Sequence, residues 1–237
     1  MLSAESLPRP HLFRPISPLR KTKPLRMEPP TSSQDVATHA TAPNHFEHIF
    51  IVTGPAGCGK TTVAQFAANN VNAPYIEGDD YHSKANKDKM ANGIPLTDAD
   101  RWDWLITLKD AAIQKLQTSN IVFVTCSALK KKYRDVMRVA NYEHPSVQIH
   151  FVYLKVDEEV LQKRVASRVG HYMKADMVHS QMVALEEPDV EEETDVIKID
   201  VRNDKEVVEQ EALTKVQAKI KEYEDFKKTH LPATTQP

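Results

Sequence analysis

The sequence predicts an α/β fold in which a mostly parallel sheet is covered by helices on both faces. From His48 onward, short apolar runs alternate with longer segments whose apolar residues recur at helical spacing. The short runs are almost continuously apolar, as expected for strands that are buried on both faces of a parallel sheet. None approaches the ~20 residues of a membrane span, so no membrane association is expected.

Strand and helix patterns follow one another in a regular order. Strands are expected at residues 48–54, 73–79, 121–127, 148–156 and 194–201. Helices are expected at residues 60–70, 101–117, 129–140, 157–169 and 208–223. The segment between the second strand and the second helix is rich in charged residues and is expected to be a loop.

Residues 1–45 differ in composition from the rest of the chain. The first 30 residues contain seven prolines, and residues 1–26 hold six basic side chains against one acidic one. Proline opposes helix, and the segment has little apolar surface to offset the entropy lost on ordering. We therefore expect a disordered tail over residues 1–45, a folded domain over residues 46–230 and a second disordered tail over residues 231–237. A mitochondrial transit peptide is an alternative, but the prolines favour a cytoplasmic protein.

Charge and cysteine content exclude several classes of protein. The formal net charge is −2, so the basic tail, at +5, leaves about −7 on the remainder. Nucleic-acid binding rests on a basic surface, and no nucleic-acid partner is expected for so acidic a domain. With only Cys58 and Cys126, neither a disulfide framework nor a four-thiolate zinc site can form.

The segment GPAGCGKT, residues 54–61, is the strongest functional signal. It matches the phosphate-binding loop G-x-x-x-x-G-K-[ST], and it lies between a predicted strand and a predicted helix, where such loops occur. Lys60 is expected to reach the β- and γ-phosphates of ATP, and the Thr61 hydroxyl to bind Mg²⁺. Cys58 is expected to fill a permissive position, a reactive thiol being the alternative. The predicted ATP-binding residues here are Gly54, Pro55, Ala56, Gly57, Cys58, Gly59, Lys60, Thr61 and Thr62.

Acidic residues follow the second predicted strand, which ends at the same edge of the sheet as the phosphate loop. There Asp79 is expected to face the γ-phosphate and its Mg²⁺, and to accept the proton of an attacking hydroxyl. His82 and Arg101 lie further along the chain and suit a polyhydroxylated anion. The sequence thus predicts a small-molecule kinase rather than a nucleotide switch.

Five motifs in order resemble the gluconokinase family of small phosphate-loop kinases. They are GPAGCGKTT, EGDDYH with ANKDKM, GIPLTDADR with WL, CSALKKKYRD, and RVGHY with SQ and LEEP, spanning about residues 49–201. The resemblance implies transfer of the γ-phosphate of ATP to the 6-hydroxyl of D-gluconate, giving 6-phosphogluconate for the pentose phosphate pathway, with Mg²⁺ as cofactor. It implies a three-layer phosphate-loop kinase fold, with a five-stranded parallel sheet and a mobile helical lid at about residues 164–190.

The resemblance also implies roles for individual residues. The implied catalytic residues are Lys60, Asp79 and Arg164, and the implied metal ligands are Thr61 and Asp79. Two arginines leading into the lid, Arg164 and Arg168, are expected to bind ATP. The implied substrate-binding residues are Asp79, His82, Arg101, Ser127, Lys130 and Arg134.

The chain departs from the family pattern at a few positions. Glu77 stands where aspartate is common, and Ser83 replaces a usual proline. Gln181 is expected to be either a polar helix residue or a functional one, and the acidic stretch over residues 186–195 to be solvated. A homodimer is common in relatives. Two alternatives stay open: a kinase of another small acceptor, such as shikimate or another sugar acid, and an inactive ATP-binding regulatory protein.

Overall fold

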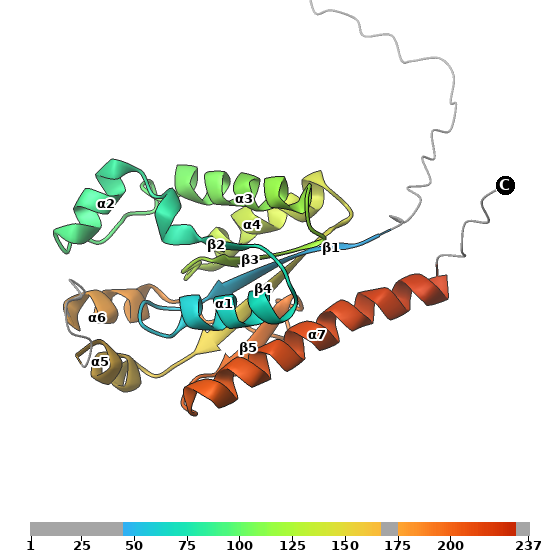
Figure 1. Cartoon of the computed structure of the whole chain (residues 1–237). Helices are drawn as coiled ribbons and strands as arrows, with labels where there is room; N and C mark the ends of the chain where they lie inside the picture. Colours follow the sequence, from blue (N-terminus) through green and yellow to red (C-terminus); the bar gives the residue numbers. More distant parts are fainter. Residues whose placement is uncertain (1–44, 167–174, 231–237) are drawn as a thin grey trace, which may run out of the picture. The chain divides into compact units, whose positions relative to one another are not determined.

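The computed structural model describes residues 45–166 and 175–230, with side chains from residue 178 in the second segment. A five-stranded sheet with the order β2-β3-β1-β4-β5 lies at the centre, and every pair of neighbouring strands is parallel (Figure 1). The predicted fold class is therefore confirmed. The strands are β1 (Glu47–Thr53), β2 (Tyr75–Glu77), β3 (Ile121–Thr125), β4 (Val147–Lys155) and β5 (Val196–Asp200).

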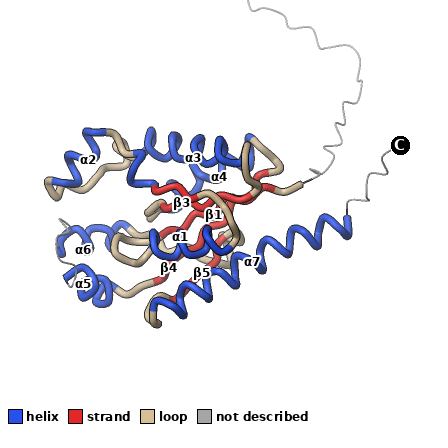
Figure 2. Tube along the Cα trace, in the orientation of Figure 1, coloured by secondary structure: helices blue, strands red, loops and turns tan. Residues whose placement is uncertain are grey.

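Helices cover both faces of the sheet (Figure 2). The predicted helices appear as α1 (Lys60–Asn70), α3 (Trp102–Leu116), α4 (Lys131–Glu143), α5 (Glu158–Ala166) and α7 (Lys205–His230). Two short helices, η1 (Gly78–Tyr81) and α2 (Lys84–Ala91), fill the segment that was expected to be a loop, and α6 (Ala175–Ala184) follows α5.

The start of α2 shows why that expectation was wrong. The Ser83 hydroxyl accepts a hydrogen bond of 3.2 Å from the backbone N–H of Asn86, so Ser83 is the N-cap of the helix. Serine is among the best residues for this role, because its oxygen satisfies an N–H that has no partner within the helix. The departure from proline at this position therefore provides a helix start.

Successive side chains of β1 point to opposite faces of the sheet, so the strand contributes to two separate hydrophobic cores. Ile49 and Ile51 are fully buried in the cluster that contains the apolar faces of α3 and α4. The alternate residues, Phe50 and Val52, lie in the second cluster, with the apolar faces of α1 and α7. A strand with both faces buried in this way has no polar side, which explains its continuously apolar sequence.

The strand register determines where the functional groups meet. Val52 of β1 is opposite Thr125 of β3, and Thr125 is also opposite Glu77 of β2. The loop after β1 and the end of β2 therefore lie at the same edge of the sheet. In Figure 1, α2, α5 and α6 also lie beyond this edge. Ligands bind at the carboxyl ends of the strands in open α/β sheets.

Arg134 of α4 is an internal structural residue. Its side chain is about 2% exposed, and its Nε and Nη2 donate to both carboxylate oxygens of Glu193, at 2.7 and 2.6 Å. Arg138 donates to the same carboxylate at 2.6 Å. The geometry gives Arg134 a structural role in place of the expected substrate contact. It also shows that the acidic stretch is not wholly solvated.

Replacing Glu193 is expected to destabilise the fold. Burial alone would raise the pKa of the Glu193 carboxyl, but its bonds to Arg134 and Arg138 lower that pKa from 4.5 to about 2. The variant Glu193→Gln leaves a buried guanidinium without its counter-charge, so the free energy of unfolding at pH 7 should fall by about 3–5 kcal/mol. Urea denaturation measures this.

The pH dependence follows from the lowered pKa. The carboxylate stabilises the wild type fully above pH 4.5, and this contribution is lost as the pH falls toward 2. The difference between wild type and Glu193→Gln should therefore shrink over that interval. The control is Glu192→Gln, which removes an exposed pair with Lys131 and should cost about 0.5 kcal/mol or less. Equal stability of Glu193→Gln and the control would contradict the assignment.

Candidate active site

The phosphate loop connects β1 to α1, and its backbone depends on glycine. Gly59, the N-cap of α1, has φ +106°, a conformation that side chains disfavour. The Lys60 ammonium donates to the carbonyl oxygens of Gly54 and Pro55, at 3.0 and 3.1 Å, and so folds back over the loop. The loop amides and the positive end of α1 form an anion-binding site.

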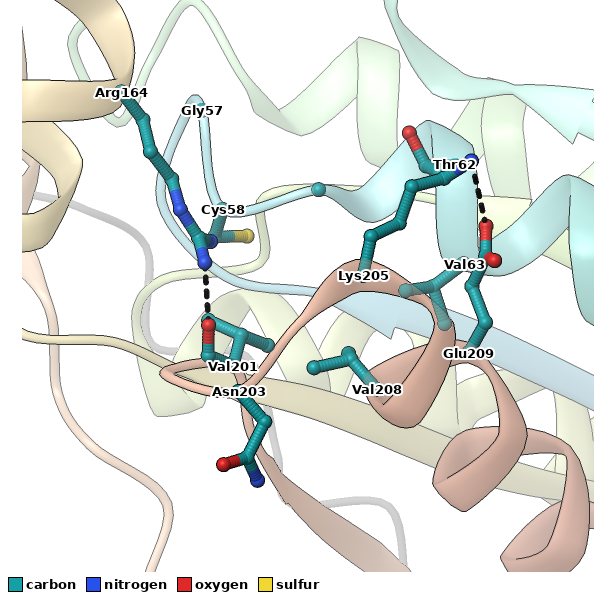
Figure 3. A pocket seen from close by; sticks show the side chains of 11 residues that line it. Gly57, Cys58, Thr62, Val63, Arg164, Val201, Asn203, Lys205, Val208 and Glu209 are labelled. Carbon is teal, nitrogen blue, oxygen red and sulfur yellow. Dashed lines mark hydrogen bonds and ion pairs between the residues drawn. The ribbon is translucent and has the colours of Figure 1, made fainter.

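A cavity of about 220 Å³ lies on one side of the loop (Figure 3). The loop contributes Gly57, Cys58, Gly59 and Thr62 to its lining. Arg164 of α5 also lines it, and its Nη2 donates to the backbone oxygen of Val201 at 2.5 Å. This places five of the predicted ATP-binding residues together.

Residues after β5 complete this cavity, and sequence reasoning missed them. They are Val201, Asn203, Lys205, Val208 and Glu209. Lys205 and Glu209 form an ion pair of 3.5 Å across one turn of α7 (Figure 3). The only available signal was their position just after the last predicted strand, since strand ends gather at the functional edge.

A second cavity, of about 130 Å³, lies on the other side of the loop and is lined by both Ala56 and Lys60. Four of the six predicted substrate-binding residues line it: Asp79, His82, Arg101 and Ser127. Apolar residues from α2, from the α2–α3 connection and from the loop after β3 also line it, and α6 contributes Ser180, Gln181 and Ala184. The position of this cavity next to Lys60 is where an acceptor must lie to receive a phosphoryl group, so we call it the acceptor cavity.

Asp79 is positioned by the tight turn after β2. A Cβ atom at Gly78 would lie 2.0 Å from the backbone oxygen of Thr125, so only glycine allows this approach to β3. The Asp79 carboxylate opens into the cavity and is accessible to solvent. The surrounding protein atoms raise its pKa by partial desolvation, while Lys60 and Arg101 oppose the rise. A raised pKa makes this carboxylate a stronger base.

His82 and Arg101 each have one buried polar atom without a hydrogen-bond partner in the described part of the chain. The His82 ring stacks on Trp104 with 4.1 Å between the centroids, and the Trp104 indole donates to the Gly78 oxygen at 2.8 Å. Burial lowers the pKa of His82 to about 4, and Arg101 and Lys87 add to this, so the ring is neutral at pH 7. Within the described residues, His82 Nδ1 and Arg101 Nε are buried without a hydrogen bond. Such atoms usually have a ligand or water as partner.

The Lys130 side chain pairs with Asp98, whereas the sequence predicted a contact with the substrate. Its ammonium lies 3.0 Å from Asp98 Oδ1, and the same carboxylate accepts hydrogen bonds from Lys132 and Tyr133. This cluster joins the α2–α3 connection to the start of α4. Lys130 does not line the second cavity, where a contact with the substrate was expected, and its ammonium is instead paired with Asp98.

An oxygen-rich group surrounds Thr61. Its hydroxyl donates to Glu77 Oε2 at 2.8 Å, and Tyr75 and Thr125 donate to the same carboxylate. Burial raises the pKa of Glu77, but these three hydrogen bonds outweigh it and lower the pKa, so the group is charged. Carboxylate and hydroxyl oxygens are the ligands that Mg²⁺ prefers. These residues therefore fit the ion that the phosphate loop implies.

Two residues of the segment predicted to be a lid remain to be placed. Arg168 lies outside the described residues. Gln181 of α6 lines the acceptor cavity, and its Oε1 accepts a hydrogen bond of 2.7 Å from the backbone N–H of Ala56. Of the two roles left open for Gln181, the structure favours the functional one.

The Cys58 thiol is expected to be unreactive. It is 2% exposed, and burial raises its pKa despite the opposing charge of Lys60. A thiol that stays protonated at pH 7.5 is a poor nucleophile. Iodoacetamide followed by mass spectrometry should leave Cys58 unmodified in the native protein and alkylate it in urea. Rapid alkylation with loss of ATP turnover, prevented by bound nucleotide, would contradict this.

Comparison with known proteins identifies the family. The family profile described as an AAA domain matches residues 49–188. A probable gluconokinase of Schizosaccharomyces pombe is 47% identical over 179 residues, covering 75% of this chain and 92% of that relative. The thermoresistant gluconokinase of Escherichia coli is 40% identical over 158 residues, covering 67% and 87%. The crystal structure of a gluconokinase from Sinorhizobium meliloti has a TM-score of 0.65 at 34% identity, covering 75% of this chain and 96% of that one. The chain therefore belongs to the gluconokinase family.

Proposed function

We propose that the protein transfers the γ-phosphate of ATP to the 6-hydroxyl of D-gluconate, giving 6-phosphogluconate and ADP. The observation that carries this is the acceptor cavity beside Lys60, which Asp79, His82 and Arg101 all line, and where His82 Nδ1 and Arg101 Nε have no hydrogen bond within the described residues. A polyhydroxylated anion supplies hydroxyl groups for the imidazole and negative charge for the guanidinium.

Each residue has a definite part in this transfer. Lys60 leaves the loop carbonyls to contact the transferred phosphate, and its charge stabilises the transition state. Asp79 accepts the proton of the attacking hydroxyl and orients the oxygen in line. Arg164 neutralises charge from the nucleotide side, and Arg168 is proposed to assist it.

Thr61, Glu77 and Asp79 are the groups that would hold Mg²⁺. When bound, the ion neutralises charge on the phosphates. Glu77 keeps the Thr61 hydroxyl oriented through the hydrogen bond between them. Tyr75 and Thr125 hold Glu77 in turn, so the orientation does not depend on solvent.

D-Gluconate is favoured as the acceptor over shikimate and over other sugar acids. An inactive regulatory protein is disfavoured, because Lys60, Thr61 and Asp79 are all present and brought together. In the described part of the chain, no helix has both the length and the apolar character to cross a membrane. A homodimer and a cytoplasmic location stay predictions.

An acceptor panel tests the reaction. With ATP and Mg²⁺, ADP release should be strong with D-gluconate and near the no-acceptor rate with glucose, shikimate and nucleoside monophosphates. Glucose lacks the carboxylate that Arg101 is proposed to bind, and shikimate lacks the flexible polyol chain. Turnover with a different acceptor would replace the substrate, and no stimulation by any acceptor would contradict the enzymatic function.

The variant Asp79→Asn tests the general base. It should lower kcat by about 10²–10⁴-fold while leaving ATP affinity little changed, because the amide cannot accept the proton. Since the Asp79 pKa is raised, the wild-type rate should fall on the acid side at a pH above that of an ordinary aspartate. The neighbouring Asp80→Asn is the matched control and should keep most of the activity. Equal rates for both variants would remove Asp79 from the mechanism.

A further inference from the structure

Gln181 joins the acceptor cavity to the phosphate loop through a single side-chain amide. It lies on α6 and is partly buried, and it lines the same cavity as Lys60 and Asp79. Its bond to the Ala56 N–H, at 2.7 Å, is short for this type of hydrogen bond.

The bond to Ala56 determines which way the amide faces. A backbone N–H can only donate, so the atom that meets it must be the amide oxygen. The Nε2 group, with its two N–H donors, is therefore directed away from Ala56. Over the part of the chain with described side chains, it has no hydrogen-bond partner. An acceptor hydroxyl in the cavity is a suitable partner, because its oxygen can accept such a bond.

The helix that carries Gln181 is fixed at its carboxyl end. Just after α6, the Glu186 N–H donates to the Leu129 oxygen at 2.9 Å, and Arg134 Nη1 donates to the Glu186 oxygen at 3.2 Å. Arg134 is itself held by the buried Glu193. The buried ion pair therefore ties α6 to the loop after β3, which supplies Ser127 to the cavity.

We propose that Gln181 is a specificity-determining residue for the acceptor. Its Nε2 donates to a hydroxyl oxygen of the aldonate, while its Oε1 keeps the hydrogen bond to the loop. An acceptor without that hydroxyl leaves the Nε2 donors unpaired in the cavity and is disfavoured. The inference rests on the proposed function and adds to it the residue that recognises one hydroxyl group of the polyol chain.

Two substitutions distinguish the role of the Gln181 amide oxygen from that of its amide nitrogen. Gln181→Met has a similar length and removes both hydrogen bonds. Gln181→Glu keeps an oxygen for the Ala56 N–H but cannot donate to the substrate. The control, Gln162→Met, makes the same chemical change on α5, where Gln162 is exposed and bonds only to Glu158 within the described residues. Each variant is assayed for kcat, for the KM values of gluconate and ATP, and for thermal stability.

Both Gln181 variants should raise the KM for gluconate by about tenfold, the value of one hydrogen bond of 1.4 kcal/mol, with little change in the KM for ATP. Gln162→Met should match the wild type. Monodeoxy gluconates add a second test. The one that lacks the partner hydroxyl should be poor for the wild type, and should be no worse than gluconate for Gln181→Met.

The inference fails if both Gln181 variants retain the wild-type KM for gluconate. It also fails if Gln181→Met lowers thermal stability and raises both KM values equally, because the residue would then only support the loop. These outcomes require a wild type that phosphorylates gluconate. A wild type without that activity would instead overturn the proposed function.

Discussion

The parallel pairing of β3 with both β1 and β2 is the constraint on which the site depends. It brings the ends of these three strands to one edge of the sheet, so that the phosphate loop, Thr125 and the end of β2 become neighbours. The phosphate loop then separates two cavities and contributes residues to each. A phosphoryl group bound by the loop is therefore held between its donor and its acceptor.

Buried polar interactions hold the parts around this edge in place. The Arg134–Glu193 pair connects α4 to the segment before β5 and, through Glu186, to the end of α6. The Asp98 cluster connects the α2–α3 loop to α4. Neither Arg134 and Glu193 nor Lys130 and Asp98 line the acceptor cavity, but both interactions connect segments that contribute residues to its lining. Charged residues in family motifs thus include supporting ones, not only ligand-binding ones.

Much of the fold could be predicted from the sequence, because buried parallel strands and amphipathic helices leave clear apolar patterns. The phosphate loop, Asp79, His82, Arg101 and Ser127 could be identified from motifs and from their positions after strands. Arg134 and Lys130 were assigned to the substrate because an arginine or lysine near a cleft suits a carboxylate. Their real partners, Glu193 and Asp98, lie 59 and 32 residues away, and local sequence patterns do not show such pairings. Gln181 stayed ambiguous for the same reason, because its bond to Ala56 spans 125 residues.

The central claim is that the acceptor's terminal hydroxyl meets the phosphoryl group between Asp79 and Lys60. The most direct test is to incubate the protein with ATP, Mg²⁺ and uniformly ¹³C-labelled D-gluconate, and to locate the phosphate by ³¹P–¹³C coupling. We expect a single product with the phosphate ester on C6. A phosphate on another carbon, or on no carbon at all, would contradict it.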